Sequence, residues 1–276
     1  MNSTKFDNFL PQEFSFPKPL ILSILENANS SLLKKLNKTC KYLFIKRNIT
    51  IIDELTIFDN TTTEGSKESI SGFELTLDLS KLDQLKNNLW ITDELRAYYY
   101  APNLSSIVNK IVKCDINYLD VLGNITFNEF KILTASGNIE QIHLFNKNPI
   151  QYSDGTNLVL DDLLLMIPKA SVIEISNVFI SKNTPKNLSM LKHQAKIRVF
   201  FVDFKQKIDV EIMNKFFMNN LDDESAIEIR FNEENDIIGE ELYDKIQTWK
   251  PEERKPKYMH LGSIFTPDPN EWPFFF

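Results

Sequence analysis

Glycine, histidine and cysteine are scarce in this chain, which has seven, three and two of them in 276 residues. No G-x-G-x-x-G or G-K-[ST] segment is present, so the glycine-rich loops that hold phosphates are missing. No serine stands in the glycine-flanked turn of a hydrolase nucleophile. His143, His193 and His260 lack the spacing of metal ligands. The sequence therefore predicts a protein that is not an enzyme, with no catalytic residues, metal site or cofactor.

Long apolar runs and paired cysteines are also lacking. Cys40 and Cys114 have no paired spacing, which is typical of a reducing compartment. Residues 1–16 contain no apolar run of signal-peptide length, and Asp161 and Asp162 interrupt the most apolar later run. The formal charge of −7 argues against non-specific nucleic-acid binding. These features predict a cytoplasmic or nuclear protein that binds neither nucleic acid nor membrane.

Two short amphipathic patterns lie near the N-terminus. Pro17 and Pro19 provide a helix start, and Leu20, Ile24 and Ala28 then recur on one helical face. A serine in "NANSS" can cap a second helix, whose apolar stripe begins at Leu32 and Leu33. Two helices this short cannot bury both stripes against each other, so they need the rest of the chain or a partner.

The same segment resembles the F-box, which runs Leu-Pro-x-x-Leu/Val-x-x-x-Ile-Leu and later has Leu-rich and Cys/Ser-Lys/Arg-aromatic elements. The matching residues are Phe16, Pro17, Leu20, Ile24, Leu25, Leu32, Leu33 and Cys40. With "CKYLF" and "LWITDEL", the chain also resembles a large nematode group of F-box-like proteins. The resemblance implies that residues 14–48 bind a Skp-type adaptor and, through it, a cullin complex. The alternative is a helical hairpin that only caps the following domain.

From residue 50 onward, short alternating strands are separated by helical patterns. Five segments align, namely "YLDVL" at 118, "QIHLF" at 141, "VIEIS" at 172, "IRVFF" at 197 and "AIEIR" at 226. Thr184-Pro185 and Asp209 are suitable starts for two of the helices between them. One strand and one helix per repeat are typical of leucine-rich-repeat-like solenoids. The fold class expected is α/β: a short N-terminal helical F-box-like module, then an irregular leucine-rich-repeat-like solenoid with a parallel sheet covered on one face.

Alternation predicts which residues of each strand face away from the helices. The inward positions are Leu119, Ile142, Ile173, Ile197 and Ile227, followed two residues later by Val121, Leu144, Ile175, Val199 and Ile229. The open face then contains Asp120, His143, Glu174, Arg198 and Glu228, with Phe145 and Phe200 beside them. A face that mixes charge with aromatic rings is predicted to bind a target protein of unknown identity. The alternative is an ordinary solvated sheet surface.

The predicted organisation is a tail (1–13), the F-box-like module (14–48), the repeat domain (49–250) and a Pro/aromatic tail (251–276). Met259–Phe265 or the terminal aromatics are expected to fold back over the last repeat near Leu242, Ile246 and Trp249. The function expected is a non-catalytic substrate receptor of an SCF-type cullin–RING ubiquitin ligase. The alternative is a free-standing interaction scaffold with a vestigial F-box as its cap.

Overall fold

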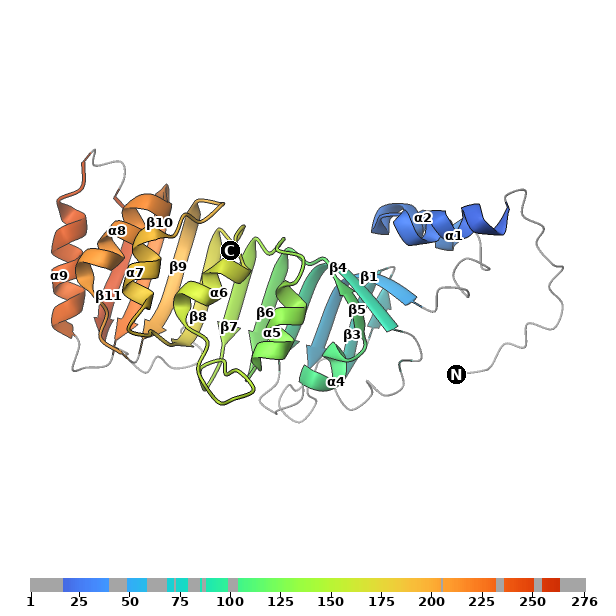
Figure 1. Cartoon of the computed structure of the whole chain (residues 1–276), viewed down its shortest axis with the longest axis horizontal. Helices are drawn as coiled ribbons and strands as arrows, with labels where there is room; N and C mark the ends of the chain where they lie inside the picture. Colours follow the sequence, from blue (N-terminus) through green and yellow to red (C-terminus); the bar gives the residue numbers. More distant parts are fainter. Residues whose placement is uncertain are drawn as a thin grey trace.

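The structure is a computed structural model with a mixed α/β fold. It describes residues 17–39, 49–58, 69–71, 73–78, 85, 88–98, 104–204, 206–231, 236–250 and 255–263. This part of the chain contains eight helices and one sheet of eleven strands (Figure 1). Phe16, Cys40 and the terminal aromatics lie outside the described residues.

The sheet is parallel throughout its described pairings except between β2 and β3. Its strands are β1 (Ile49–Phe58), β2 (Ser69–Ser71), β3 (Glu74–Asp78), β4 (Asn88–Tyr98), β5 (Ile111–Cys114), β6 (Tyr118–Leu122), β7 (Gln141–Phe145), β8 (Val172–Val178), β9 (Ile197–Phe204), β10 (Leu221–Phe231) and β11 (Tyr258–Ser263). The strand order is β11-β10-β9-β8-β7-β6-β4-β1-β3-β2, and β5 also pairs with β4. The prediction of a large parallel sheet is confirmed.

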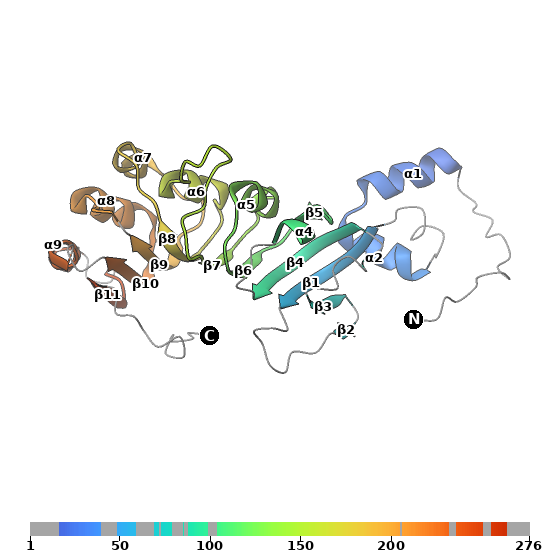
Figure 2. The same cartoon turned by 90° about the horizontal axis from the view of Figure 1, so that it is seen from below.

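Six helices cover one face of this sheet (Figure 2). They are α4 (Leu104–Val108), α5 (Phe127–Thr134), α6 (Leu160–Met166), α7 (Thr184–Met190), α8 (Val210–Asn220) and α9 (Asp236–Gln247). The start of α5 is a capping box, in which Thr126 and Glu129 satisfy each other's backbone N–H groups. Asp209 caps α8 by accepting from the Ile212 N–H at 3.1 Å, as predicted. The main core lies between these helices and the sheet.

A series of backbone hydrogen bonds runs across the starts of the strands and connects each strand–helix unit to the next. The N–H of Asn117 donates to the Asp93 carbonyl, that of Glu140 to Asn117, and that of Ser171 to Glu140, at 2.7–2.8 Å. The register then aligns positions 119, 142, 173, 200, 227 and 259 across β6 to β11. Each unit therefore places its first core residue at the same level of the sheet.

The predicted register of β9 is wrong. Ile197 and Phe200 are both fully buried although they lie three residues apart, so the inward–outward alternation breaks between them, where the register of β9 against β10 also shifts. Beyond this irregularity Phe200 faces the helices and Phe201 pairs with Glu174 on the open face. Arg198 therefore does not belong to the open-face row, and Val199 is not a core residue of β9.

Phe200 is fully buried and is not an open-face residue. Its ring lies 5.8 Å from that of Phe216 and 5.4 Å from that of Phe217, both on α8. "IRVFF" is apolar in both alternation phases, so the sequence did not determine which phenylalanine would point inward.

The N-terminal helices α1 (Lys18–Asn27) and α2 (Ser30–Thr39) pack on a small cluster apart from the main core. In this cluster Leu33 of α2 meets Ile51 and Trp90. Leu89 and Ile91, the neighbours of Trp90 on β4, belong to the main core. Because side chains alternate along a strand, Trp90 points to the opposite face. The helix α2 therefore covers the start of β1 and β4 on the face that α4–α9 leave open.

The predicted C-terminal tail contributes a strand. Residues 258–263 form β11, which pairs with β10, and Met259 and Leu261 pack against the main core. The segment thus extends the sheet past residue 250, beyond the predicted end of the repeat domain.

Replacing Gly239 with alanine should lower stability, although alanine is the better helix former. A Cβ at Gly239 in α9 would lie 2.8 Å from the Leu261 carbonyl oxygen of β11. Because that oxygen belongs to backbone, the helix must shift, at about 1–3 kcal/mol for such overpacking, against about 1 kcal/mol of helix propensity gained. Urea denaturation measures the change, with exposed Glu240→Ala as the control expected within about 0.5 kcal/mol of wild type. A more stable Gly239→Ala variant would contradict the close approach of α9 to β11.

Candidate binding face of the sheet

One row of side chains runs from β4 to β10 across the face of the sheet opposite α4–α9. Register places Arg96, Asp120, His143, Glu174, Phe201 and Glu228 side by side, one from each strand. These residues alternate with the buried residues of the main core, such as Leu119 and Val121, so they point away from the helices. Four of the five row residues predicted from sequence are brought together here. Arg198 is not, and Phe201 takes its place.

Asp120, on β6, accepts a hydrogen bond from a tyrosine on the neighbouring strand β4. The Tyr98 hydroxyl donates to Asp120 Oδ2 at 2.8 Å. Burial raises the pKa of the Asp120 carboxyl, and Glu174 adds to the rise, while Tyr98 and His143 oppose it. Burial and the Asp120 charge also raise the pKa of Tyr98. The tyrosine therefore stays protonated and remains a donor to the carboxylate.

Arg96 forms a second cluster beside this pair. Its Nη2 lies 2.6 Å from Glu94 Oε2, and its guanidinium stands 5.1 Å from the ring centroid of Tyr118. Burial, followed by the charge of Asp120, raises the pKa of Tyr118 to about 12. The Tyr118 ring lies 5.4 Å from that of His143, whose Nδ1 is 2.9 Å from Glu174 Oε2. Polar contacts thus link β4, β6, β7 and β8 across the face.

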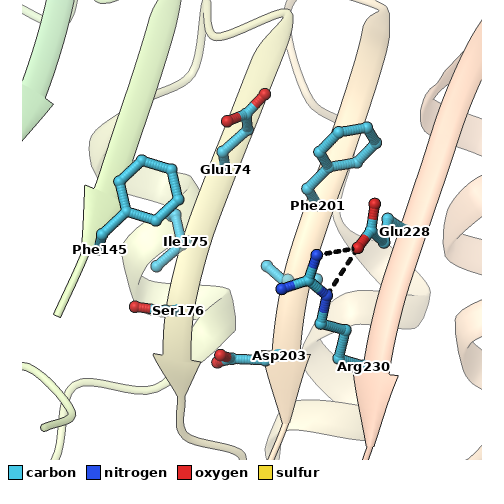
Figure 3. Close-up of a pocket in the computed structure, with 9 residues that line it drawn as sticks. Phe145, Glu174, Ile175, Ser176, Phe201, Asp203, Glu228 and Arg230 are labelled. Carbon is cyan, nitrogen blue, oxygen red and sulfur yellow. Dashed lines mark hydrogen bonds and ion pairs between the residues drawn. The ribbon is translucent and has the colours of Figure 1, made fainter. Parts of the chain in front are cut away.

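A shallow pocket lies at the β7–β10 end of the row (Figure 3). Phe145 and Phe201 stand on two sides of it, and Glu174 lies between them on β8. Arg230 Nε donates to Glu228 Oε1 at 2.6 Å, which holds both side chains at the β10 wall. The pocket is completed by Ile175, Ser176, Val202 and Asp203.

The arrangement offers recognition chemistry. Among the described residues, no three His, Cys, Asp or Glu side chains converge as metal ligands would. Cys114 is buried, and burial raises its thiol pKa to about 12, so it is not poised as a nucleophile. Carboxylates, guanidinium groups and aromatic rings on this face of the sheet can bind another chain through ion pairs and stacking.

Sequence reasoning found Asp120, His143, Glu174, Glu228 and Phe145 on this face and missed several others. The missed residues are Tyr98, Arg96, Tyr118 and Phe201, whereas Arg230 was expected beside the row. Extending the alternation along β4 and β6 would have found three of them. Phe201 could not be found in this way, because the alternation breaks between Ile197 and Phe200.

The residues predicted for adaptor binding divide into exposed and buried. Leu20 is 45% exposed and Leu32 is 44% exposed, as is Leu22 at 45%. Pro17 is exposed, Ile24 is half-buried and Leu33 is fully buried in the small cluster. Phe16, Cys40 and the side chain of Leu25 lie outside what the structure describes.

Comparisons of the chain with protein-family models, with curated proteins and with solved structures found no match. None of the helices in the described part of the chain has the length and apolarity needed to cross a membrane. The function is therefore inferred from the geometry of the molecule and from its sequence.

Asp120→Asn should raise stability at neutral pH. A carboxyl whose pKa is raised in the folded state binds more protons folded than unfolded, so wild-type stability falls as pH rises above the ordinary value of 3.8. Asparagine keeps an acceptor for Tyr98 and removes the buried charge. Melting temperatures should therefore be similar at pH 3, with the variant higher at pH 7.

The matched control is Asp154→Asn, because Asp154 is solvent-exposed and its pKa is lowered by hydrogen bonds from Thr156. The Asp154→Asn variant should show no gain in melting temperature over wild type at pH 7. A loss of stability in Asp120→Asn at pH 7 would show that the carboxylate stabilises the fold, contrary to its position on a recognition surface.

Proposed function

We propose that this chain is a non-catalytic substrate receptor of an SCF-type cullin–RING ubiquitin ligase. In this role α1 and α2 bind a Skp-type adaptor, and the face of the sheet opposite α4–α9 binds the target. The observation that carries the proposal is the exposure of Leu20, Leu22 and Leu32 on helices that contact the sheet through a separate small cluster.

Exposed leucines gathered on one helix pair are typical of a surface that another protein covers. Burying the exposed part of each would contribute about 1 kcal/mol, since complete burial of a leucine contributes about 1.5–3 kcal/mol. Because Leu33 holds α2 against Ile51 and Trp90, the pair would be presented in a fixed position at one end of the sheet. The resemblance of residues 14–48 to the F-box names the adaptor as the partner.

The repeat region would be an irregular leucine-rich-repeat-like solenoid. Its strand–helix units follow one another in chain order from β6 to β11, with α5–α9 along one face. The shared series of backbone hydrogen bonds at the strand starts supports this interpretation, because it recurs from unit to unit. A receptor of this form contributes proximity and performs no chemistry itself.

The test is co-expression of the full chain with a Skp-type adaptor. Wild type should co-purify with the adaptor, and the Leu20→Asp/Leu32→Asp variant should not, with an unchanged melting temperature because both side chains are exposed. The matched control is Leu165→Asp/Met190→Asp, since these residues are 66% and 63% exposed on α6 and α7. This control adds the same charge and should retain the adaptor.

The second candidate is a free-standing scaffold in which the N-terminal helices only cap the sheet. It is favoured by the contacts of α2, where Lys34 Nζ donates to Thr92 Oγ1 at 3.1 Å and pairs with Asp53. If the adaptor fails to co-purify with the folded wild-type chain, the capping role is the correct one.

A further inference from the structure

Carboxylates recur on every second strand of the open-face row. Asp120 lies on β6, Glu174 on β8 and Glu228 on β10, with His143 and Phe201 between them. Neighbouring strands are about 4.8 Å apart, so the strands that carry consecutive carboxylates are about 9.6 Å apart across the sheet.

Each of these carboxylates is engaged through one oxygen. Asp120 Oδ2 accepts from Tyr98, Glu174 Oε2 meets His143, and Glu228 Oε1 accepts from Arg230. The other oxygen of each has no hydrogen-bond partner within the described part of the chain. For Glu228 this is notable because the residue is only 6% exposed and lines the pocket. A carboxylate can accept several hydrogen bonds, so three acceptors remain in line for a bound chain.

Within the described rows of β4 and β6–β11, this face is acidic and contains no lysine. Across β4 and β6–β11, the row and the two rows beside it contain five carboxylates (Glu94, Asp120, Glu174, Asp203 and Glu228) and two guanidinium groups (Arg96 and Arg230). Both guanidinium groups are paired with a glutamate on their own strand. A cationic partner is the one that this charge distribution complements.

We propose that the open face binds an extended segment of a partner protein that has a basic side chain at every third position. A polyproline II segment has three residues per turn and rises about 3.1 Å per residue, so such side chains repeat about every 9.3 Å on one side. This distance matches the spacing of the strands that carry the carboxylates. The inference rests on the proposed function only in naming that partner as the ligase target.

The pocket in Figure 3 provides the strongest of the three contacts. A basic side chain that enters between Phe145 and Phe201 meets two aromatic rings and has the Glu174 and Glu228 carboxylates beside it. Cations bind favourably against aromatic faces, and more so where water is partly excluded. The pocket therefore fixes the register of the segment, and Asp120 binds the next basic residue along.

Fluorescence anisotropy with two labelled nonapeptides of equal composition tests the proposal on the full chain. One peptide is Arg-Pro-Ser repeated three times, and the other has its three arginines consecutive at the N-terminus. The spaced peptide should bind at least about threefold more tightly, because the clustered one cannot reach three carboxylates at once. Its affinity should fall with added salt, since ion pairs at the surface are screened.

Two variants locate the binding. Glu174→Gln and Phe201→Leu should each weaken binding of the spaced peptide by about three- to tenfold. The matched control is Glu240→Gln, an exposed α9 position with the same change in net charge, and it should leave binding unchanged. Melting curves confirm that each variant is folded.

Equal affinity for the two peptides, no binding of either, or equal weakening by Glu240→Gln would overturn the proposal. Adaptor co-purification distinguishes such a failure from failure of the proposed function. The Glu174→Gln and Phe201→Leu variants should retain the adaptor, and Leu20→Asp/Leu32→Asp should still bind the spaced peptide.

Discussion

Replacing Arg230 with methionine should lower the free energy of unfolding by about 3–5 kcal/mol, as expected when one partner of a buried ion pair is removed. The guanidinium binds Glu228 Oε1 through both Nε and Nη2, and the two side chains are 16% and 7% exposed. Methionine fills similar volume but leaves the Glu228 carboxylate without a counter-charge inside the β10 wall of the pocket. Urea denaturation with the full chain measures the change.

The double variant Glu228→Gln/Arg230→Met should recover most of the loss, because it removes both charges together. A surface pair gives the matched control. Lys257 and Glu224 are 2.6 Å apart but mostly exposed, so Lys257→Met should cost less than about 1 kcal/mol. Equal effects at Arg230 and Lys257 would show that the Glu228–Arg230 pair is solvated and would contradict the walls assigned to the pocket.

Phe200→Ala should lower the free energy of unfolding by about 3–5 kcal/mol, the usual cost of emptying a buried phenylalanine site. The ring is fully buried against Phe216 and Phe217 of α8, so its removal leaves a cavity between the helices and β9. Thermal or urea unfolding gives the value.

The neighbouring residue is the control for the register of β9. Phe201 is half-buried on the open face, so Phe201→Ala should cost clearly less than Phe200→Ala. Arg198 is exposed, and Arg198→Ala should stay within about 0.5 kcal/mol of wild type. A larger loss at Phe201 than at Phe200 would reverse the register and return Arg198 to the row.

Much of the sheet could be predicted because its local signals agree. In β6, β7, β8 and β10, one alternation phase is aliphatic and the other mainly polar, so each strand has a single way to face the core. Asp209 marks a helix start through a short-range hydrogen bond, as predicted, whereas the predicted cap Thr184 lies inside α7, whose N-cap is Asn183. The prediction for β9 failed because both of its phases are apolar and the alternation breaks between Ile197 and Phe200.

The order of the first strands could not be predicted, since it depends on contacts between distant segments. β1 lies between β3 and β4, so chain order and sheet order differ there. The contact of α2 with Ile51 and Trp90 depends on this order. The pairing of Tyr98 with Asp120 likewise needed the register of β4 against β6.

Asp120, Glu174 and Glu228 could be placed on the open face by alternation alone, whereas the pocket could not. Its second aromatic wall, Phe201, is set by the break in alternation in β9, and the position of the Arg230 guanidinium, expected beside the row, is set by its ion pair with Glu228. The positions of the row residues therefore follow from the local sequence, whereas the shape of the pocket depends on contacts formed only in the folded chain.

Hydroxyl-radical footprinting of the full chain, with and without a purified Skp-type adaptor, tests the central claim most directly. The adaptor should protect Leu20, Leu22 and Leu32 from modification, while the similarly exposed Leu165, Met190 and Met218 on the outer helices should stay reactive. Unchanged modification of the three N-terminal leucines at saturating adaptor would contradict the substrate-receptor role and leave α1 and α2 as a cap on the sheet.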